Sequence, residues 1–345
     1  MICANQTPDH TTIARFRRRH EAALAGLFGE VLALCTEAGL VELGVLAVDS
    51  TKLHANASHH ATRDYEQIAA EILEEADAVD AAEDERLGER RGDELPPELA
   101  TSQGRRGWLR EAKRRLEEEH QVECQANADY EAYRVRGVMK DGRRFGRPPN
   151  PHTPPPMPPG KVNVTDPDSR NVKTPRGWVQ GYSAQVVCNE SQIVVAAEVN
   201  VDSPDFGHLG PMVDTAEQEL VAVGVSERPS VVLADTGYWH QAQMDEIAAR
   251  GTTVLIPPDA GKRNGARPGW DAGRYAFMRR VLKTDIGRAL YGKRQGMIEP
   301  VFANTKFNRR IDRFLRRSRA ACRSEWRLIA ATHNLLKLHT ATAAA

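Results

Sequence analysis

The sequence predicts an α/β fold in which a mixed sheet is flanked by helices and carries a helical insertion after its first strand. Two observations support this prediction. Apolar runs of strand length alternate with amphipathic runs of helix length in the second half of the chain. A charged, helix-forming block and a Pro-rich block separate the first apolar run from all the others.

The N-terminal part is predicted to hold one helix and one strand. Apolar residues recur at helical spacing over 11–38, and Gly39 follows as a helix stop. This helix makes residues 1–43 an N-terminal helical segment. The run Val45–Val48 is continuous and apolar, which predicts a first strand, buried on both faces, within residues 44–61.

Two blocks without strand character come next. Residues 62–139 are charged and helix-forming, and we expect two or three helices there as an insertion. Residues 140–160 contain the stretch GRPPNPHTPPPMPPG, which predicts an extended linker.

Regular structure resumes in residues 161–345, which we assign to the remainder of the catalytic domain with a basic C-terminal helix. The pattern predicts a hairpin of two strands at 179–188 and 192–201. It predicts two further strands at 230–234 and 253–256, and three helices at 209–223, 241–250 and 295–338. Pro300 is expected near the first turn of the last helix. With the insertion removed, this order fits a ribonuclease-H-like fold, in which the first and fourth strands are neighbours.

Composition excludes several classes of protein. The five cysteines show no CxxC spacing, which argues against a disulfide framework or a zinc site and suits a reducing cytoplasm. No apolar run approaches the roughly 18 residues that a membrane span needs, and the N-terminus has no signal-peptide pattern. We therefore expect a cytoplasmic protein without a membrane partner.

The neutral total charge conceals a strong asymmetry. Residues 62–100 hold fourteen acids against four Arg, whereas residues 261–345 hold twenty Lys or Arg against five acids. A basic segment of that density is typical of proteins that bind a phosphate backbone. The alternative is that the basic segment pairs with the acidic one inside the molecule.

Three acids form the candidate catalytic site. Asp49 and Asp235 each follow an apolar run of strand type, and Glu299 lies near the start of the predicted basic helix. A carboxylate at the end of a buried strand is costly unless it is paired or binds a cation. Together the three predict a site for two Mg²⁺ or Mn²⁺ ions. Taken singly, each acid is more typical of an ordinary turn or of a solvated helix.

Basic residues near these acids are candidates for DNA contact. Lys52 follows the first strand, and either a phosphate contact or simple exposure explains it. Arg309, Arg313 and Arg316 share one face if residues 295–338 form a continuous helix. We expect that face to be exposed and to follow one DNA backbone.

Six ordered stretches carry a family resemblance over nearly the whole chain from Pro8 onward. They are VLAVDSTKLHANAS, TDPDSR, GWVQGYSAQVV, VVLADTGYWH, VLIPP, and YGKRQGMIEPVFANTKFNRR with EWRLIAATHNLLKL. The chain resembles DDE transposases of bacterial insertion sequences, in the branch with a Tyr-Arg-Glu-Lys signature helix. The resemblance implies that Asp49, Asp235 and Glu299 bind the catalytic metals. It also implies that Tyr291, Arg294 and Lys306 act around them on the DNA.

Two departures from the family pattern stand out. The usual signature has three residues between its Arg and Glu, whereas four separate Arg294 from Glu299. Such proteins also usually carry a further N-terminal DNA-binding region, so the chain is expected to be a truncated copy.

The resemblance implies metal-dependent DNA cleavage and strand transfer at the ends of a mobile element. It also implies DNA as partner, a homodimer in the DNA complex and a place at the bacterial nucleoid. Two alternatives stay open, a catalytically inactive DNA-binding relic and a ribonuclease-H-like nuclease that cuts without joining.

Overall fold

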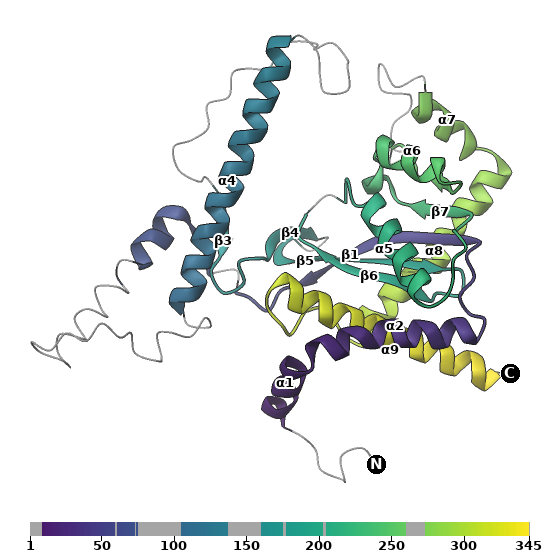
Figure 1. Ribbon diagram of the computed structural model, residues 1–345, viewed down its shortest axis with the longest axis horizontal. Helices are drawn as coiled ribbons and strands as arrows, with labels where there is room; N and C mark the ends of the chain where they lie inside the picture. The colour runs from purple at the N-terminus through teal and green to yellow at the C-terminus, as the bar shows by residue number, and fades with distance from the viewer. Residues whose placement is uncertain are drawn as a thin grey trace, which may run out of the picture. The chain divides into compact units, whose positions relative to one another are not determined.

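A computed structural model describes residues 9–58, 61–72, 74, 105–136, 160–174, 177–202, 205–259 and 273–344 of the chain (Figure 1). The chain divides into two units. The first comprises Met1–Asn56 and Asn171–Ala345, and the second comprises Ala57–Arg170. The second unit is thus inserted into the first, directly after the first strand.

A six-stranded mixed sheet forms the centre of the first unit. Its strands are β1 (Val45–His54), β4 (Arg170–Thr174), β5 (Gly177–Asn189), β6 (Val194–Asn200), β7 (Val231–Ala234) and β8 (Thr253–Leu255). The order is β4–β5–β1–β7–β8, with β6 also paired to β5. β1 runs antiparallel to β5 and parallel to β7, and β8 runs parallel to β7. The predicted ribonuclease-H-like fold class is confirmed. The first and fourth strands of the predicted order are β1 and β7, and they pair as expected.

Burial explains why these segments are strands. The side chains of Leu46, Ala47 and Val48 are almost completely buried, as a strand with neighbours on both sides requires. The hairpin between β5 and β6 is closed by Asn189, whose side-chain oxygen accepts from the amide of Ile193 at 2.9 Å. Gln192 adopts a φ of 62°, the left-handed conformation that closes the turn.

Helices cover the sheet of the first unit. They are α1 (His10–Arg19), α2 (Glu21–Glu37), α5 (Leu209–Ala222), α6 (Gln241–Ala249), α7 (Gly273–Val281), α8 (Asp285–Ala303) and α9 (Arg319–Ala344). α9 packs along β6 and lies beside α2, while α8 packs on β1, β5 and β7 (Figure 1). The single helix predicted over 11–38 is wrong. The helix is interrupted at His20, whose φ of −112° and ψ of 27° are not helical, and α2 begins at the next residue.

The continuous helix predicted from Gln295 to Leu338 is also wrong. α8 begins ten residues earlier, at Asp285, ends at Ala303 and continues as a π-helical turn, η3 (Asn304–Asn308). Residues 309–318 are not helical. Phe314 is fully buried there with its ring 5.9 Å from that of Tyr182, and its amide donates to the carbonyl of His54. Burial of Phe314, together with the bridge between Arg313 and His54, places this non-helical segment next to the end of β1.

Pro300 lies in the last turn of α8 rather than in its first. Proline has no amide hydrogen, so the carbonyl of Gly296 receives no helical hydrogen bond from it. The side-chain amide of Gln192 donates to that carbonyl at 2.9 Å instead. The hairpin turn therefore supports the helix at the point where proline weakens it.

The second unit is small and held by charge as well as by apolar contact. It contains β2 (Thr62–Asp64), helical residues 65–72, α4 (Arg105–Arg136) and β3 (Lys161–Asn163), which pairs with β2. Its core consists of Ile68, Leu109, Ala112, Leu116 and Val162. Residues 75–104, which hold most of the acidic segment, lie outside the described residues. So do residues 137–159, which hold nearly all of the Pro-rich linker.

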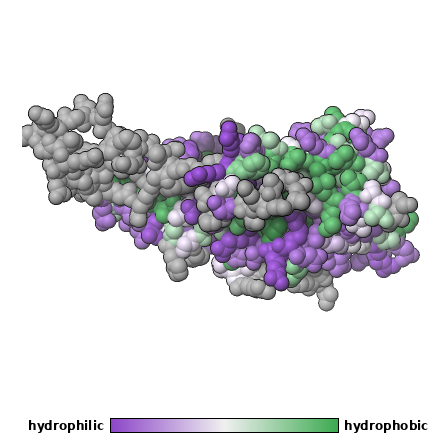
Figure 2. Space-filling view, turned by 90° about the horizontal axis from the view of Figure 1, so that it is seen from below, coloured by the Kyte–Doolittle hydropathy of each residue, from purple (hydrophilic) through white to green (hydrophobic). Residues whose placement is uncertain are grey.

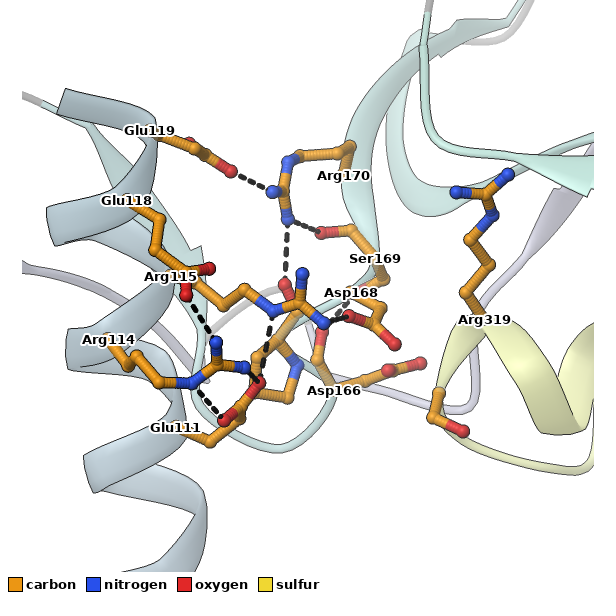
Figure 3. A network of polar contacts seen from close by, with 12 residues as sticks. Glu111, Arg114, Arg115, Glu118, Glu119, Asp166, Asp168, Ser169, Arg170 and Arg319 are labelled. Atoms are coloured by element: carbon orange, nitrogen blue, oxygen red, sulfur yellow. Dashed lines mark hydrogen bonds and ion pairs between the residues drawn. The ribbon is translucent and has the colours of Figure 1, made fainter. Parts of the chain in front are cut away.

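Figure 3 shows the ion pairs that join α4 to the turn preceding β4. Arg115 contacts Asp168 at 2.7 Å, and Arg170 pairs with Glu119. Arg170 also donates to the carbonyl of Pro167 at 2.7 Å. The charged composition of this insertion thus serves, in these residues, to fix the turn against the helix.

Apolar side chains gather on the side of the first unit along which α2 and α9 run (Figure 2). Leu27 and Leu34 of α2 and Leu335 and Leu336 of α9 are exposed. None of the helices within the described ranges is long and apolar enough to cross a membrane.

We predict that Gly287→Ala destabilises the protein by about 1–3 kcal/mol. A Cβ at Gly287 would lie 2.0 Å from the carbonyl oxygen of Val281, which is backbone and cannot move aside. Gly292, in the same helix, has no atom within 4 Å of such a Cβ. Gly292→Ala should therefore raise stability by about 1 kcal/mol through helix propensity. Urea unfolding of both variants measures the difference, and equal effects would contradict the packing of α8 described above.

Candidate active site

Asp49 lies in the middle of β1, and Asp235 directly follows β7, the strand next to β1. Val48 and Ala234 are the last registered pair between the parallel strands β1 and β7, and each is followed directly by the aspartate. Neighbouring strands are about 4.8 Å apart, so the two carboxylates start from adjacent positions. Asp235 also caps the short turn η2 (Thr236–Tyr238), because its Oδ1 accepts from the amide of Gly237 at 2.8 Å.

The carboxylate of Asp49 is largely shielded from solvent and has two donors. The amide of Ser50 donates to Oδ1 at 2.7 Å, and Nη2 of Arg294 donates to Oδ2 at 2.6 Å. Burial raises the pKa of Asp49 to about 6, although Arg294 and the Ser50 amide lower it. The nearby carboxylates Asp235 and Asp205 raise the pKa further. Negative charge in this site is therefore only partly compensated by the protein.

Helix α8 brings Tyr291 and Arg294 to the two aspartates. Both side chains are half-buried and lie one helical turn apart. Burial is the main cause that raises the pKa of the Tyr291 phenol, and Asp235 and Asp49 add to it. Nε of Arg294 is buried without a hydrogen-bond partner in the described part of the chain. The guanidinium is thus held mainly by its contact with Asp49.

Glu299, the third predicted catalytic acid, lies on a different side of α8 from Arg294, which contacts Asp49. It is exposed, and its carboxylate accepts from the side chain of Gln295 at 3.2 Å. Residues in an α-helix follow one another by about 100°, so Glu299 lies about 140° around the helix from Arg294. Ile298, at the position four residues after Arg294, is fully buried instead.

A hydrogen bond links the predicted DNA-binding residue Lys306 to the backbone of Lys52 on β1. Nζ of Lys306 donates to the carbonyl of Lys52 at 2.9 Å, and burial lowers the pKa of Lys306. Nζ of Lys52 donates to Ser183 at 2.7 Å and contacts Asp205 at 3.3 Å. A phosphate contact by Lys52 would have to exchange these bonds.

The three arginines predicted to share one helix face do not do so, because residues 309–318 are not helical. Arg309 donates to the carbonyl of Ile329 at 2.9 Å, and Arg316 pairs with Glu21 at 2.6 Å. Arg313 is exposed, next to the bridge that its backbone makes with His54. The contribution of the three to DNA binding stays a prediction.

One residue beside the two aspartates, Asp205, was not predicted from the sequence. Asp205 lies in the loop between β6 and α5, and its carboxylate reaches Ser50 and Lys52. Tyr238 is fully buried behind Asp235. The stretch DSPDFG around Asp205 has the composition of an ordinary turn, so no local signal identifies it.

Comparison with known proteins shows the family. Residues 152–335, more than half of the chain, match the family described as "Transposase DDE domain". The chain belongs to this family. No curated protein and no solved structure matches the chain. Membership makes the protein a transposase of the DDE type, with DNA as its partner.

DDE transposases generally use divalent metal ions. In the described ranges, no three His, Cys, Asp or Glu side chains are close enough together to hold a metal ion. Asp49 and Asp235 fit such an ion by their chemistry, because they offer hard oxygen donors whose charge is only partly compensated. A third ligand would have to come from α8, where Glu299 is exposed.

We predict that Arg294→Ala raises the pKa of Asp49 above its value of about 6. The guanidinium favours the ionised carboxylate, so its removal leaves burial and like charge unopposed. Carboxyl NMR without metal measures this pKa, with the Asp49 signal assigned by its loss in Asp49→Asn. Arg288→Ala, an exposed pair with Asp285 on the same helix, is the control and should leave the signal unchanged.

The same shift sets a pH dependence of stability. The pKa of Asp49 is higher in the folded chain than its ordinary value of 3.8, so the folded state binds this proton more tightly. Its contribution to stability is therefore largest below about pH 4 and is lost as the pH rises to about 6. In Arg294→Ala the loss should continue to higher pH. A loss that ends at the wild-type pH would contradict the role of Arg294 as counter-ion.

Proposed function

We propose that this transposase cleaves DNA at the ends of a mobile element and transfers the freed strand to target DNA in a metal-dependent reaction. The observation that carries this proposal is the position of Asp49 and Asp235. Asp49 lies within β1, and Asp235 directly follows β7, the parallel neighbour of β1 at the centre of a ribonuclease-H-like sheet, in a chain of the DDE transposase family. The negative charge of Asp49, which Arg294 and the Ser50 amide compensate only in part, supports the same proposal.

In this proposal Asp49, Asp235 and Glu299 hold two Mg²⁺ or Mn²⁺ ions. Bound ions would supply Lewis-acid stabilisation of the charge that develops on the phosphodiester oxygens. For Glu299 to take part, α8 has to turn or shift so that its carboxylate approaches the sheet. Arg294 and a metal ion held by Asp49 would compete for the same carboxylate, so metal binding would weaken the Arg294–Asp49 pair.

The remaining signature residues would act on the DNA backbone. Tyr291 and Arg294 already lie at the edge where the scissile phosphate would sit, and Lys306 is anchored to β1 behind it. Released from Asp49, Arg294 offers a planar set of donors that suits a phosphate. These positions support assignment to the branch with the Tyr-Arg-Glu-Lys signature helix.

The reaction needs two phosphoryl transfers. In the first, a water oxygen bonds to the phosphorus and the 3′ oxygen leaves with a proton. In the second, that 3′-hydroxyl attacks a phosphodiester of the target and displaces its 3′ oxygen. The protein acts by placing the reacting groups and by neutralising charge, and its acids need not carry protons.

DNA binding without cleavage is a second candidate function. The observation that favours it is the exposure of Glu299, which leaves only two of the three predicted metal-binding acids, Asp49 and Asp235, next to each other. Metal-dependent nicking of DNA that carries the element ends separates the two candidates. Joining of end-labelled DNA separates a transposase from a nuclease that only cuts, and light scattering of the DNA complex tests the proposed homodimer.

We predict that Glu299→Gln lowers the cleavage rate in Mg²⁺ by about 100-fold or more, because one metal-ligating charge is lost. DNA affinity should stay within about twofold, since phosphate contacts by basic residues supply most of it. Asp285→Asn, a change at another exposed acid of α8, is the control and should cleave at the wild-type rate. Equal rates for Glu299→Gln and the wild type would remove Glu299 from the site.

We predict that Arg313→Ala reduces the slope of log affinity against log salt by about 0.9, as the loss of one phosphate contact requires. Arg313 is chosen because it is exposed, whereas Arg316 pairs with Glu21. Arg316→Ala should therefore lower the thermal midpoint more than Arg313→Ala does. DNA titrations at four salt concentrations measure the slope, and an unchanged slope in Arg313→Ala contradicts the contact.

A further inference from the structure

Asp205 is the centre of a polar cluster formed by two neighbouring strands. Its carboxylate accepts from Ser50 Oγ at 2.9 Å and from Lys52 Nζ at 3.3 Å, both on β1. It also accepts from Ser183 Oγ at 3.3 Å and from Gln185 Nε2 at 3.4 Å, both on β5. Ser50 is registered with Gln185, and Lys52 with Ser183, so all four side chains project from the same face of the sheet.

This cluster is connected to Asp49 through a single residue. The hydroxyl of Ser50 donates to Asp205, while the amide of the same residue donates to Oδ1 of Asp49 at 2.7 Å. Fixing the Ser50 side chain therefore also fixes the amide that orients the Asp49 carboxylate. Lys52 adds a second constraint, because its ammonium contacts Asp205 and its carbonyl accepts from Lys306.

The cluster also touches the turn that carries Asp235. A Cβ built on Gly237 would lie 3.0 Å from Oδ1 of Asp235 and 3.8 Å from Oδ2 of Asp205. Behind this turn, the hydroxyl of Tyr238 is fully buried and approaches Ser50 without reaching hydrogen-bond geometry. Asp205 therefore contacts Ser50, next to Asp49, and lies close to the turn that follows Asp235.

Asp205 is suited to hold other residues rather than to bind a metal itself. One of its oxygens accepts from Ser50, and the other faces the ammonium of Lys52. That ammonium already neutralises the carboxylate at a position that a divalent ion would need. As a negative charge Asp205 disfavours ionisation of Asp49, but it is the weakest of the causes that shift that group. Loss of orientation should therefore outweigh relief of repulsion when Asp205 is removed.

We propose that Asp205 is a positioning residue of the active site, which holds the Asp49 carboxylate in its metal-binding orientation through Ser50 and Lys52. This inference rests on the proposed function, since it assumes that Asp49 binds the metal. It assigns to the loop between β6 and α5 a direct influence on metal affinity.

The test compares Asp205→Ala, Asp205→Asn and the control Asp202→Ala. Asn keeps an oxygen that accepts from Ser50 but loses the charge opposite Lys52. Asp202 is an acid of the same loop whose side chain is 66% exposed. Isothermal titration calorimetry measures Mn²⁺ binding to each full-length protein without DNA, and urea unfolding confirms that each variant is folded.

We expect Asp205→Ala to weaken Mn²⁺ binding by about 10–100-fold, the range for residues that orient metal ligands. Asp205→Asn should recover most of that loss, and Asp202→Ala should bind as the wild type does. Unchanged or tighter binding in Asp205→Ala would overturn the proposal. An Asn variant as weak as the Ala variant would also overturn it, because orientation through Ser50 would then not be the cause.

A second measurement keeps this inference separate from the proposed function. Hydrogen exchange of the Ser50 amide, measured by NMR without metal, reports the hydrogen bond to Asp49 directly. It should accelerate about tenfold or more in Asp205→Ala and stay close to the wild-type rate in Asp205→Asn. If the wild type binds no Mn²⁺, the proposed function fails while this readout still decides the inference. Wild-type exchange in Asp205→Ala would overturn it.

Discussion

Burial of the Asp49 carboxylate in the middle of the central strand β1 is the constraint on which the arrangement of the candidate site depends. A shielded negative charge is tolerated only with donors around it. The two donors to Asp49 are the guanidinium of Arg294 on α8 and the backbone amide of Ser50. The hydroxyl of Ser50 in turn donates to Asp205. Helix, strand and loop are thereby tied to one carboxylate.

The rotation of α8 decides which of its side chains reach that carboxylate. With three residues between arginine and glutamate, the acid would follow Arg294 by about 40° around the helix. Four residues separate the two here, so Glu299 follows Arg294 by about 140° instead. Ile298 occupies the position that the glutamate would otherwise have, and it is fully buried. The π-helical turn η3 then adds a residue to the following turn, and Lys306 again points toward β1. The spacing that distinguishes this sequence therefore has a direct structural counterpart.

Sequence patterns predicted the sheet and the two aspartates because both depend on local apolar runs and on strand order. The break at His20 and the non-helical path of residues 309–318 were missed, since helical spacing continues through both. In the second case the burial of Phe314 against Tyr182 and the hydrogen bonds from the Leu315 and Arg316 amides to Glu325 hold the segment, and the first of these contacts joins distant parts of the chain. Asp205 was missed for the same reason, because the hydrogen bonds described for its side chain come from β1 and β5, far away in the sequence.

The insertion of Ala57–Arg170 between the first strand and its partners has a consequence for folding during synthesis. β1 leaves the ribosome before the whole inserted unit, and β5 and β7 follow only after it. Until then both edges of an apolar strand lack hydrogen-bonding partners. Contacts of such high sequence separation form slowly, and their delay favours aggregation of the nascent chain. Early folding of the inserted unit, which is closed by β2 and β3, would shorten the loop that β1 has to span.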